Sequence, residues 1–294
     1  MRDTVFAAHG AGTPIRLFTP TAWQSAAASQ SPAVLATTER AGFKGKSGQM
    51  AQVAGPDGAL EEILFGLGDS VIPNAMGLRA LAAGAPAGDY HLIEGHAGLD
   101  ATQIALAWAM GRYRFDRYKQ APEPGQVRLV PPDDADLDLA LSLARACAMT
   151  RDMINTPAND MGPQDIQVIA QDLAARHGAQ ISVVLGDELM EAGYPVIHAV
   201  GRAAVAQRAP RMIEMTWGNG DHPRLALVGK GVVFDTGGLD LKPSSGMRWM
   251  KKDMGGAAHV LGLASMIMEA SLPVKLSVLI PVVENAVEIG RAHV

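Results

Sequence analysis

Two lysines and two aspartates gather in one glycine-rich stretch of this chain. Lys230, Asp235, Lys242 and Asp253 lie between residues 229 and 256, where glycines interrupt short apolar runs. Because glycine frees the backbone, such a stretch can bring polar side chains together in a small volume. Carboxylates are hard oxygen ligands for divalent metals, and lysines supply either an amine ligand or a positive charge near a reacting oxygen. The residue types therefore indicate metal-assisted catalysis.

The order of the residues separates this interpretation from a simpler one. Lysines and aspartates beside glycines are often solvated loop residues, and a surface pair of them contributes about 0 to 1 kcal/mol. Three linked segments favour catalysis: Lys-x4-Asp-x-Gly-Gly at 230–238, Leu-Lys-Pro-Ser-x-Gly-Met at 241–247, and Met-Lys-x-Asp-Met-Gly-Gly-Ala-Ala at 250–258. Together these segments closely resemble the signature of the cytosolic leucyl aminopeptidase family, whose members are two-metal exopeptidases.

The resemblance implies a role for each of these residues. Asp235 would bridge two metal ions, and Lys230 and Asp253 would ligate the more tightly held one. An ammonium group has no lone pair, so Lys230 can ligate a metal only as the neutral amine. Lys242 would be catalytic, since a lysine that does not touch metal keeps its charge and can stabilise the oxyanion of a tetrahedral intermediate. Met250 would line the pocket for the substrate's first side chain, although a methionine at this spacing is otherwise more often part of a core.

The same resemblance implies a reaction and partners. Two divalent ions, zinc or manganese, would activate a water molecule to attack the scissile carbonyl, and one ion would anchor the free α-amine of the substrate. Such a site removes single N-terminal residues from short peptides. The resemblance further implies a homohexamer with the catalytic domains at its centre. The alternative is a non-catalytic scaffold or binding protein that has kept the fold.

The chain departs from the family pattern after Glu284 and Asn285. Family members continue into a Pro-Gly-Asp segment and an Asn-Thr-Asp-Ala-Glu-Gly-Arg motif that completes the metal shell, and neither occurs here. With three expected ligands left, we expect the 294-residue chain to bind metal poorly and to be inactive. Residues 288–294 can be encoded by a common sequencing-adapter sequence, so we expect them to be non-native, with a natural truncation as the alternative. We also expect an exposed, aggregation-prone strand edge beginning at Val274–Val283.

Composition favours a globular protein with two domains. Of the 294 residues, 48% are hydrophobic, so the chain can bury a full core. Its length exceeds the size at which single cores usually stop growing. A net charge of −5 argues against a nucleic-acid-binding surface, which is normally basic. The single Cys147 lies in an apolar, helix-like run, where a buried thiol is expected rather than a nucleophile. Because no stretch approaches ~20 apolar residues and the N-terminus lacks a long apolar segment, we expect a cytoplasmic protein without a membrane segment.

The pattern of elements places the lysine–aspartate cluster in the second of two α/β domains. We predict a small N-terminal α/β domain at 1–121, a proline-rich linker at 122–135, and a catalytic domain with a mostly parallel central sheet at 136–294. Lys230 and Asp235 should fall just past a strand's end, where open α/β sheets place their sites. Predicted helices are 101–118, 136–155, one beginning at Pro163 and ending before Gly178, and 255–270. Predicted strands are 15–18, 90–93, 181–185, 211–217, 225–228 and 274–280.

Overall fold

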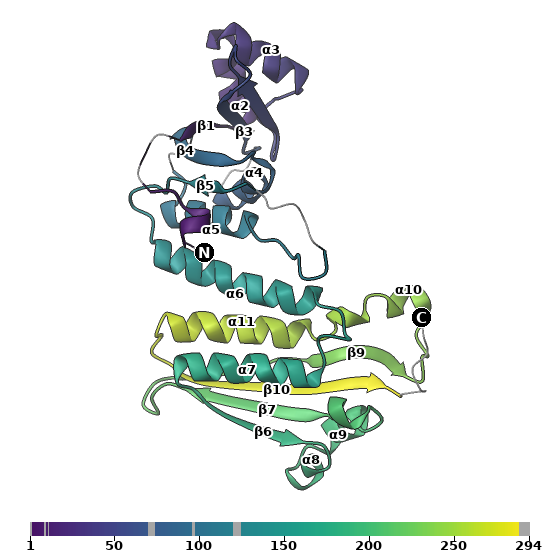
Figure 1. The fold of residues 1–294 in the computed structure, drawn as a ribbon. Coiled ribbons are helices and arrows are strands. Elements are labelled where there is room, and N and C mark those ends of the chain that lie inside the picture. Colours follow the sequence, from purple (N-terminus) through teal and green to yellow (C-terminus); the bar gives the residue numbers. More distant parts are fainter. Residues whose placement is uncertain are drawn as a thin grey trace. The chain divides into compact units, whose positions relative to one another are not determined.

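The computed structural model describes residues 2–8, 10, 12–69, 74–95, 98–119 and 125–287. The chain divides into two compact units, Met1–Ala144 and Arg145–Val294, and each has its own sheet and hydrophobic core (Figure 1). Residues 288–294, which the sequence predicts to be non-native, lie outside the described residues. The predicted domain boundaries at 121, 122–135 and 136 stay predictions.

The elements of the first unit follow in chain order, with η marking 3-10 helices. They are α1 (Arg2–Val5), β1 (Thr13–Phe18), α2 (Pro20–Ala26), η1 (Ala27–Ser29), α3 (Pro32–Arg40), β2 (Met50–Ala54), β3 (Leu60–Gly66), η2 (Ala75–Gly77), α4 (Leu78–Gly84), β4 (Gly88–Glu94), α5 (Ala101–Gly111) and β5 (Val127–Leu129). Helix α6 (Leu137–Asn155) crosses the boundary between the units.

The second unit carries the remaining elements. They are α7 (Pro163–His177), β6 (Gln180–Leu185), α8 (Glu188–Glu191), α9 (Pro195–Gly201), η3 (Ala206–Arg208), β7 (Arg211–Trp217), β8 (Arg224–Val228), β9 (Gly231–Gly238), α10 (Ser244–Met247), η4 (Met250–Lys252), α11 (Gly255–Glu269) and β10 (Lys275–Ala286).

The first sheet has the strand order β2-β3-β1-β4-β5, in which only the β2–β3 pair is antiparallel among the described strands. Ile15 and Ile63 from its centre and Trp108 from α5 are fully buried in one core. One sequence expectation changes here, because α5 ends at Gly111 instead of reaching 118. Strand β5 lies inside the segment 122–135, whose role as a linker stays a prediction. A Cβ at position 111 would lie 2.4 Å from a backbone oxygen of α4, so glycine is needed where the two helices meet.

The second sheet has the order β6-β7-β10-β8, and β9 continues along β10 beyond the end of β8. Of the strands that the structure describes in this sheet, only β7 runs against the other four, as the pairings of β6, β7 and β10 require. Strand β10 alternates buried and half-buried residues, with Leu276, Val278, Ile280 and Val282 almost fully buried. The expectation of an exposed edge at 274–283 is therefore wrong, because β10 is the centre of this sheet, with β7 on one side and β8 and β9 on the other.

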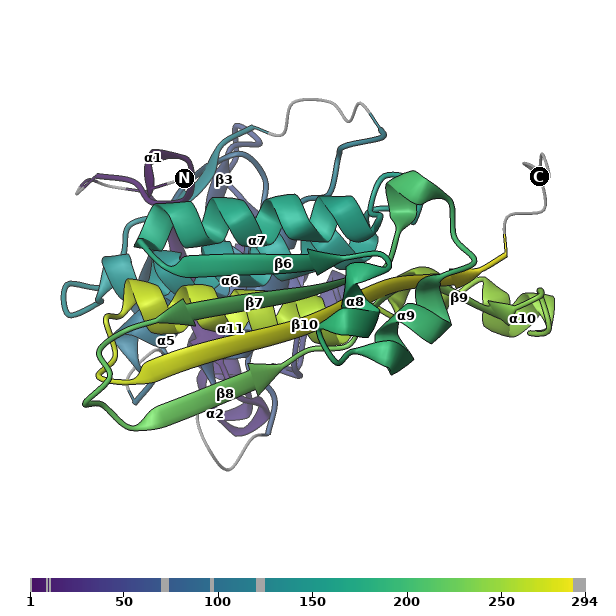
Figure 2. The same cartoon turned by 90° about the horizontal axis from the view of Figure 1, so that it is seen from below.

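Helices α7 and α11 cover one face of the second sheet, while α8 and α9 lie on its other side (Figures 1 and 2). The sequence explains α7 well. Pro163 occupies its first turn, Ile166 and Leu173 are buried, and Gly178 ends it in the left-handed conformation at φ 67°. The apolar helix α11 packs its Leu261 and Ala264 into the same core as β10. This core includes residues of β9, β10 and α11, and the predicted site residues lie on β9 and on the loops and short helix that flank it.

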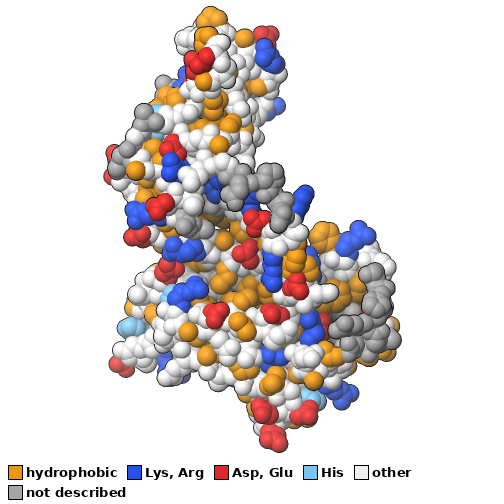
Figure 3. All heavy atoms as spheres, in the orientation of Figure 1, with side chains coloured by type: hydrophobic (Ala, Val, Ile, Leu, Met, Phe, Trp, Pro, Cys, Tyr) orange, Lys and Arg blue, Asp and Glu red, His pale blue; other side chains and the backbone are white. Residues whose placement is uncertain are grey.

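The fold is a mixed α/β architecture with four of the five strands in each sheet running in one direction, as the sequence predicts. No helix among the described residues combines the length and apolarity that crossing a bilayer requires. Basic and acidic side chains are interspersed on the face drawn in Figure 3, which agrees with the net charge of −5 and shows no basic stripe there.

Candidate functional site

The predicted site residues lie between the end of β8 and the start of α11 in the second unit, with Asp235 inside β9, Met250 in η4 and the other three in the connections between elements. Lys230 lies two residues past Val228, the last residue of β8, as expected. Asp235 instead lies inside β9, so its expected position past a strand end is wrong. The sequence pattern misses β9 because its apolar run is short and ends in Gly237 and Gly238, both at positive φ. Strand β9 reaches beyond β8 along β10, and this places Asp235 at an open end of the sheet.

Both oxygens of the Asp235 carboxylate accept polar hydrogens. The backbone N–H of Gly237 donates to Oδ1 over 3.0 Å, and the Asn285 side-chain amide donates to the same oxygen over 2.7 Å. The Lys242 ammonium pairs with Oδ2. Burial alone raises the pKa of Asp235, but the hydrogen bonds from Lys242, Gly237 and Asn285 together outweigh it, so the pKa lies below its ordinary value. This carboxylate is held as a fixed anion.

Lys242 joins Asp235 to Met250. Besides its ion pair, the Lys242 Nζ donates to the backbone carbonyl of Asp235 over 2.9 Å and lies 3.3 Å from Sδ of Met250. The side chain remains 30% exposed, so its charge is accessible from solvent. The loop around it also exposes Leu239, Leu241 and Trp249. A positive charge therefore lies beside apolar side chains at the surface.

Lys230 and Asp253 form the second pair, at 2.8 Å between Nζ and Oδ2. Their backbones approach closely because of glycine. A Cβ at Gly256 would lie 2.9 Å from the Lys230 nitrogen, and one at Gly229 would lie 2.9 Å from the start of α11. In this gap the Ala257 N–H donates to the Lys230 carbonyl over 2.9 Å. The Asp-Met-Gly-Gly-Ala segment thus fits against the chain after β8 because Gly229 and Gly256 carry no side chain at this contact.

The five predicted residues form two groups in the structure: the Lys230–Asp253 ion pair, and the Lys242–Asp235 ion pair with Met250 in contact with Lys242. Sequence reasoning missed two further residues at this place. Asn285 contacts Asp235 directly, and the ammonium of Lys251 donates to the carbonyls of Ile154 and Asn155 over 2.8 and 3.2 Å at the end of α6. A polar residue at the end of an otherwise apolar strand was the available signal for Asn285.

The donor set is chemically suited to divalent cations. Asp235 and Asp253 offer carboxylate oxygens, Lys230 offers an amine, and each carboxylate is already stabilised by a positive charge. Within the described ranges, no three histidine, cysteine, aspartate or glutamate side chains gather into a metal-binding group. The two carboxylates and the amine are therefore of ligand types that divalent cations accept.

Comparison with known families shows which family the chain belongs to. The family model described as cytosol aminopeptidase family, catalytic domain, matches residues 148–292, and that of the M17 aminopeptidase N-terminal domain matches 13–132. The chain belongs to the cytosol aminopeptidase family. The match to the catalytic domain includes all five predicted site residues and the first five of the seven residues predicted to be non-native.

Relatives agree with the assignment to the cytosol aminopeptidase family. A protein of Nocardia farcinica named probable cytosol aminopeptidase is 32% identical over 262 residues, 83% of this chain and 52% of that one. The crystal structure of a cytosol aminopeptidase from Coxiella burnetii matches with a TM-score of 0.85 at 34% identity, covering 98% of this chain and 62% of that one. The bottromycin maturation enzyme BotP, in complex with Mn, matches with a TM-score of 0.75 at 30% identity over 97% of this chain and 62% of that one. The chain spans about half the length of the curated relatives it matches.

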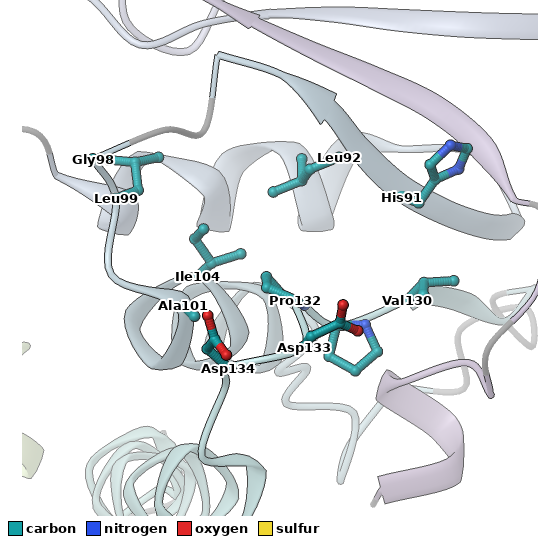
Figure 4. A pocket seen from close by; sticks show the side chains of 11 residues that line it. His91, Leu92, Gly98, Leu99, Ala101, Ile104, Val130, Pro132, Asp133 and Asp134 are labelled. Atoms are coloured by element: carbon teal, nitrogen blue, oxygen red, sulfur yellow. The ribbon is translucent and has the colours of Figure 1, made fainter.

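The first unit contains a cavity of about 490 Å³ (Figure 4). It lies near the ends of β4 and β5 and beside the first turn of α5, and its lining mixes apolar side chains with His91, Asp133 and Asp134. The buried Nδ1 of His91 has no hydrogen-bond partner among the described residues. None of the five predicted site residues lines this cavity, so it takes no part in the candidate site.

Proposed function

We propose that this protein acts as a metal-dependent aminopeptidase that removes the N-terminal residue from short peptides. The observation that supports this most directly is the position of Lys242, whose ammonium contacts both Asp235 and Met250. This arrangement places a charge that can stabilise an oxyanion between an expected metal ligand and an apolar side chain. Membership of the cytosol aminopeptidase family gives the same reaction class.

Three residues would hold the metal. Asp235 would bridge two divalent ions, zinc or manganese, and Lys230 as the neutral amine and Asp253 would ligate one of them. When bound, the ions supply a Lewis acid for the scissile carbonyl and lower the pKa of a water molecule so that hydroxide is available near neutral pH. The Mn complex of BotP supports manganese as one candidate.

The chain's own residues have separate tasks in this proposal. Lys242 keeps its charge and stabilises the oxyanion that forms when the carbonyl is attacked. Met250, held against Lys242, borders the space for the first side chain of the peptide. The exposed Leu239, Leu241 and Trp249 add apolar surface beside it, which favours peptides with an apolar first residue. We further propose a cytoplasmic homohexamer, which light scattering would detect as six protomers.

Replacement of the bridging ligand tests the function. We expect Asp235→Ala to abolish peptide hydrolysis in the protein expressed from the complete genomic reading frame, because the change removes a ligand of both ions. Chelated parent protein should regain activity with zinc or manganese, and the variant should not. Lys275→Ala, on β10 but outside the site, is the control. Retention of more than a few per cent of parental turnover by Asp235→Ala would reject the bridging role, and a fully metal-loaded but inactive parent would favour a scaffold.

A further inference from the structure

The pairing between β9 and β10 is irregular at the candidate site. The ladder is regular up to Val283, then shifts register before Glu284 and again after Asn285. The two shifts isolate a short stretch in which Asn285 lies directly opposite Asp235. Bulges of this kind redirect side chains and are common beside functional sites. Here the result is a 2.7 Å hydrogen bond from the Asn285 amide to Oδ1 of Asp235.

A second contact fixes the backbone of Asn285. The hydroxyl of Thr236, a residue only 5% exposed, donates to the Asn285 carbonyl over 3.0 Å. The same hydroxyl accepts the N–H of Gly238 over 3.1 Å. Side-chain hydrogen bonds therefore hold the two strands together at the point where the ladder shifts. Asn285 is restrained at its main chain while its amide reaches the carboxylate.

Asn285 differs from the other donors to Asp235 in where it originates. Gly237 is two residues from Asp235 and Lys242 is seven, so both move with the same loop. Asn285 is 50 residues away, on the central strand of the sheet. Among the described residues, it is the donor that ties the carboxylate to the hydrophobic core through β10. Groups that orient a metal ligand from outside the metal shell commonly tune affinity about 10- to 100-fold.

We propose that Asn285 is a positioning residue that orients the Asp235 carboxylate for metal binding, with Thr236 holding Asn285 in place. This inference rests on the proposed function for the metal, but the orientation of Asp235 can be measured without it. If Asn285 had only a structural role, its replacement would change the melting temperature and leave the Asp235 carboxylate in place. If Asn285 positions the carboxylate, its replacement would release Oδ1 of Asp235, and the N–H of Gly237 would lose its acceptor at the same time.

Two measurements on the protein expressed from the complete genomic reading frame test the proposal. Amide hydrogen exchange in the presence of chelator reports the Gly237 N–H, and titration calorimetry reports Mn²⁺ affinity. The variants are Asn285→Leu, which keeps the branched shape without the donor, Asn285→Ala in case the first does not fold, and Thr236→Val. Ser277→Ala, on the same strand where it pairs with β7 and β8, is the matched control.

We expect Asn285→Leu to accelerate exchange at Gly237 at least tenfold and to weaken Mn²⁺ binding about 10- to 100-fold. Thr236→Val should produce the same two changes to a smaller extent, and Ser277→Ala should produce neither. Unchanged exchange at Gly237 in a folded Asn285 variant overturns the proposal whatever the metal does. If the parent chain binds no Mn²⁺, its metal site fails as proposed here, and the exchange measurement still decides the role of Asn285.

Discussion

The two aspartates of the site are held by different kinds of structure. Asp235 lies in a strand and receives hydrogen bonds from its own turn, from the neighbouring strand and from Lys242. Asp253 lies at the end of the short helix η4, and its ion-pair partner Lys230 has a side chain that is 59% exposed. Both carboxylates are about equally buried, at 20% and 17% exposure. Burial therefore does not distinguish the two carboxylates, but the number and the origin of their hydrogen-bond and ion-pair partners do.

If both carboxylates ligate metal as proposed, this difference separates a fixed ligand from an adjustable one. The donors of Asp235 orient the carboxylate before any ligand arrives, which reduces the cost of binding. Asp253 owes its position to the backbone around it: Lys251 binds the end of α6, and glycines let α11 approach Lys230. The Asp253 carboxylate can therefore leave its ion pair with the exposed Lys230 and pair with another cation at little cost in free energy. We therefore expect the Asp235 half of the site to be rigid and the Asp253 half to adapt.

The largest effect expected in this comparison is a difference between the two lysines that form ion pairs with these carboxylates. In the protein expressed from the complete genomic reading frame, Lys242→Ala should lower turnover by roughly 10²- to 10³-fold, the usual loss for one oxyanion donor. Its metal content, measured by mass spectrometry of the metal, should stay near that of the parent. Lys230→Ala should instead lose metal, because it removes a ligand. Equal loss of metal in both variants would contradict the division of labour between the pairs.

The second prediction compares the carboxylates themselves in the metal-free chain. Asp235→Asn should lower the free energy of unfolding by about 2 kcal/mol, because hydrogen bonds to a charged group are lost and two amide groups then face each other at Asn285. Asp253→Asn should cost less than about 1 kcal/mol, since its partner is largely solvated. Urea unfolding in the presence of chelator measures both. A larger loss for Asp253→Asn would reverse the comparison of the two halves.

Local patterns in the sequence were sufficient to predict most of the elements around the candidate site. The periodicity of α7, its Pro163 and its Gly178 are local signals, and the structure confirms the helix they predict. The spacing of glycines with Lys230 and Asp253 also depends on neighbours in sequence. These features could be recognised without knowing how distant strands pair.

The errors concern contacts between distant residues. The apolar run of β10 indicates burial but cannot say whether the strand is at the edge or the centre, since that depends on pairing with β7 some 60 residues earlier, as Val278 with Met215 shows. The contact of Asn285 with Asp235 depends on two register shifts, which no periodicity reveals. The sequence does not distinguish Lys251 from its basic neighbours, because its partners lie far away in the sequence, at the end of α6.

The smallest predicted effect tests whether the Asp253 half is held through the backbone of its turn. Lys251 donates to two carbonyls at the end of the 19-residue helix α6, where the helix dipole favours a positive charge. Lys251→Met should therefore lower the free energy of unfolding by about 0.5 to 1 kcal/mol. Lys252→Met is the matched control, because this neighbouring lysine is exposed and the change removes the same charge.

Urea unfolding of the two variants at low and high salt distinguishes a specific contact from a general charge effect. A contact with the carbonyls predicts a loss for Lys251→Met that partly survives salt, because hydrogen bonds between partly buried groups are screened less than exposed charges. Equal losses in both variants would mean that net charge alone is responsible. A loss for Lys251→Met above that of Asp235→Asn would show that the turn at Asp253, not the strand at Asp235, is the more strongly fixed half of the site.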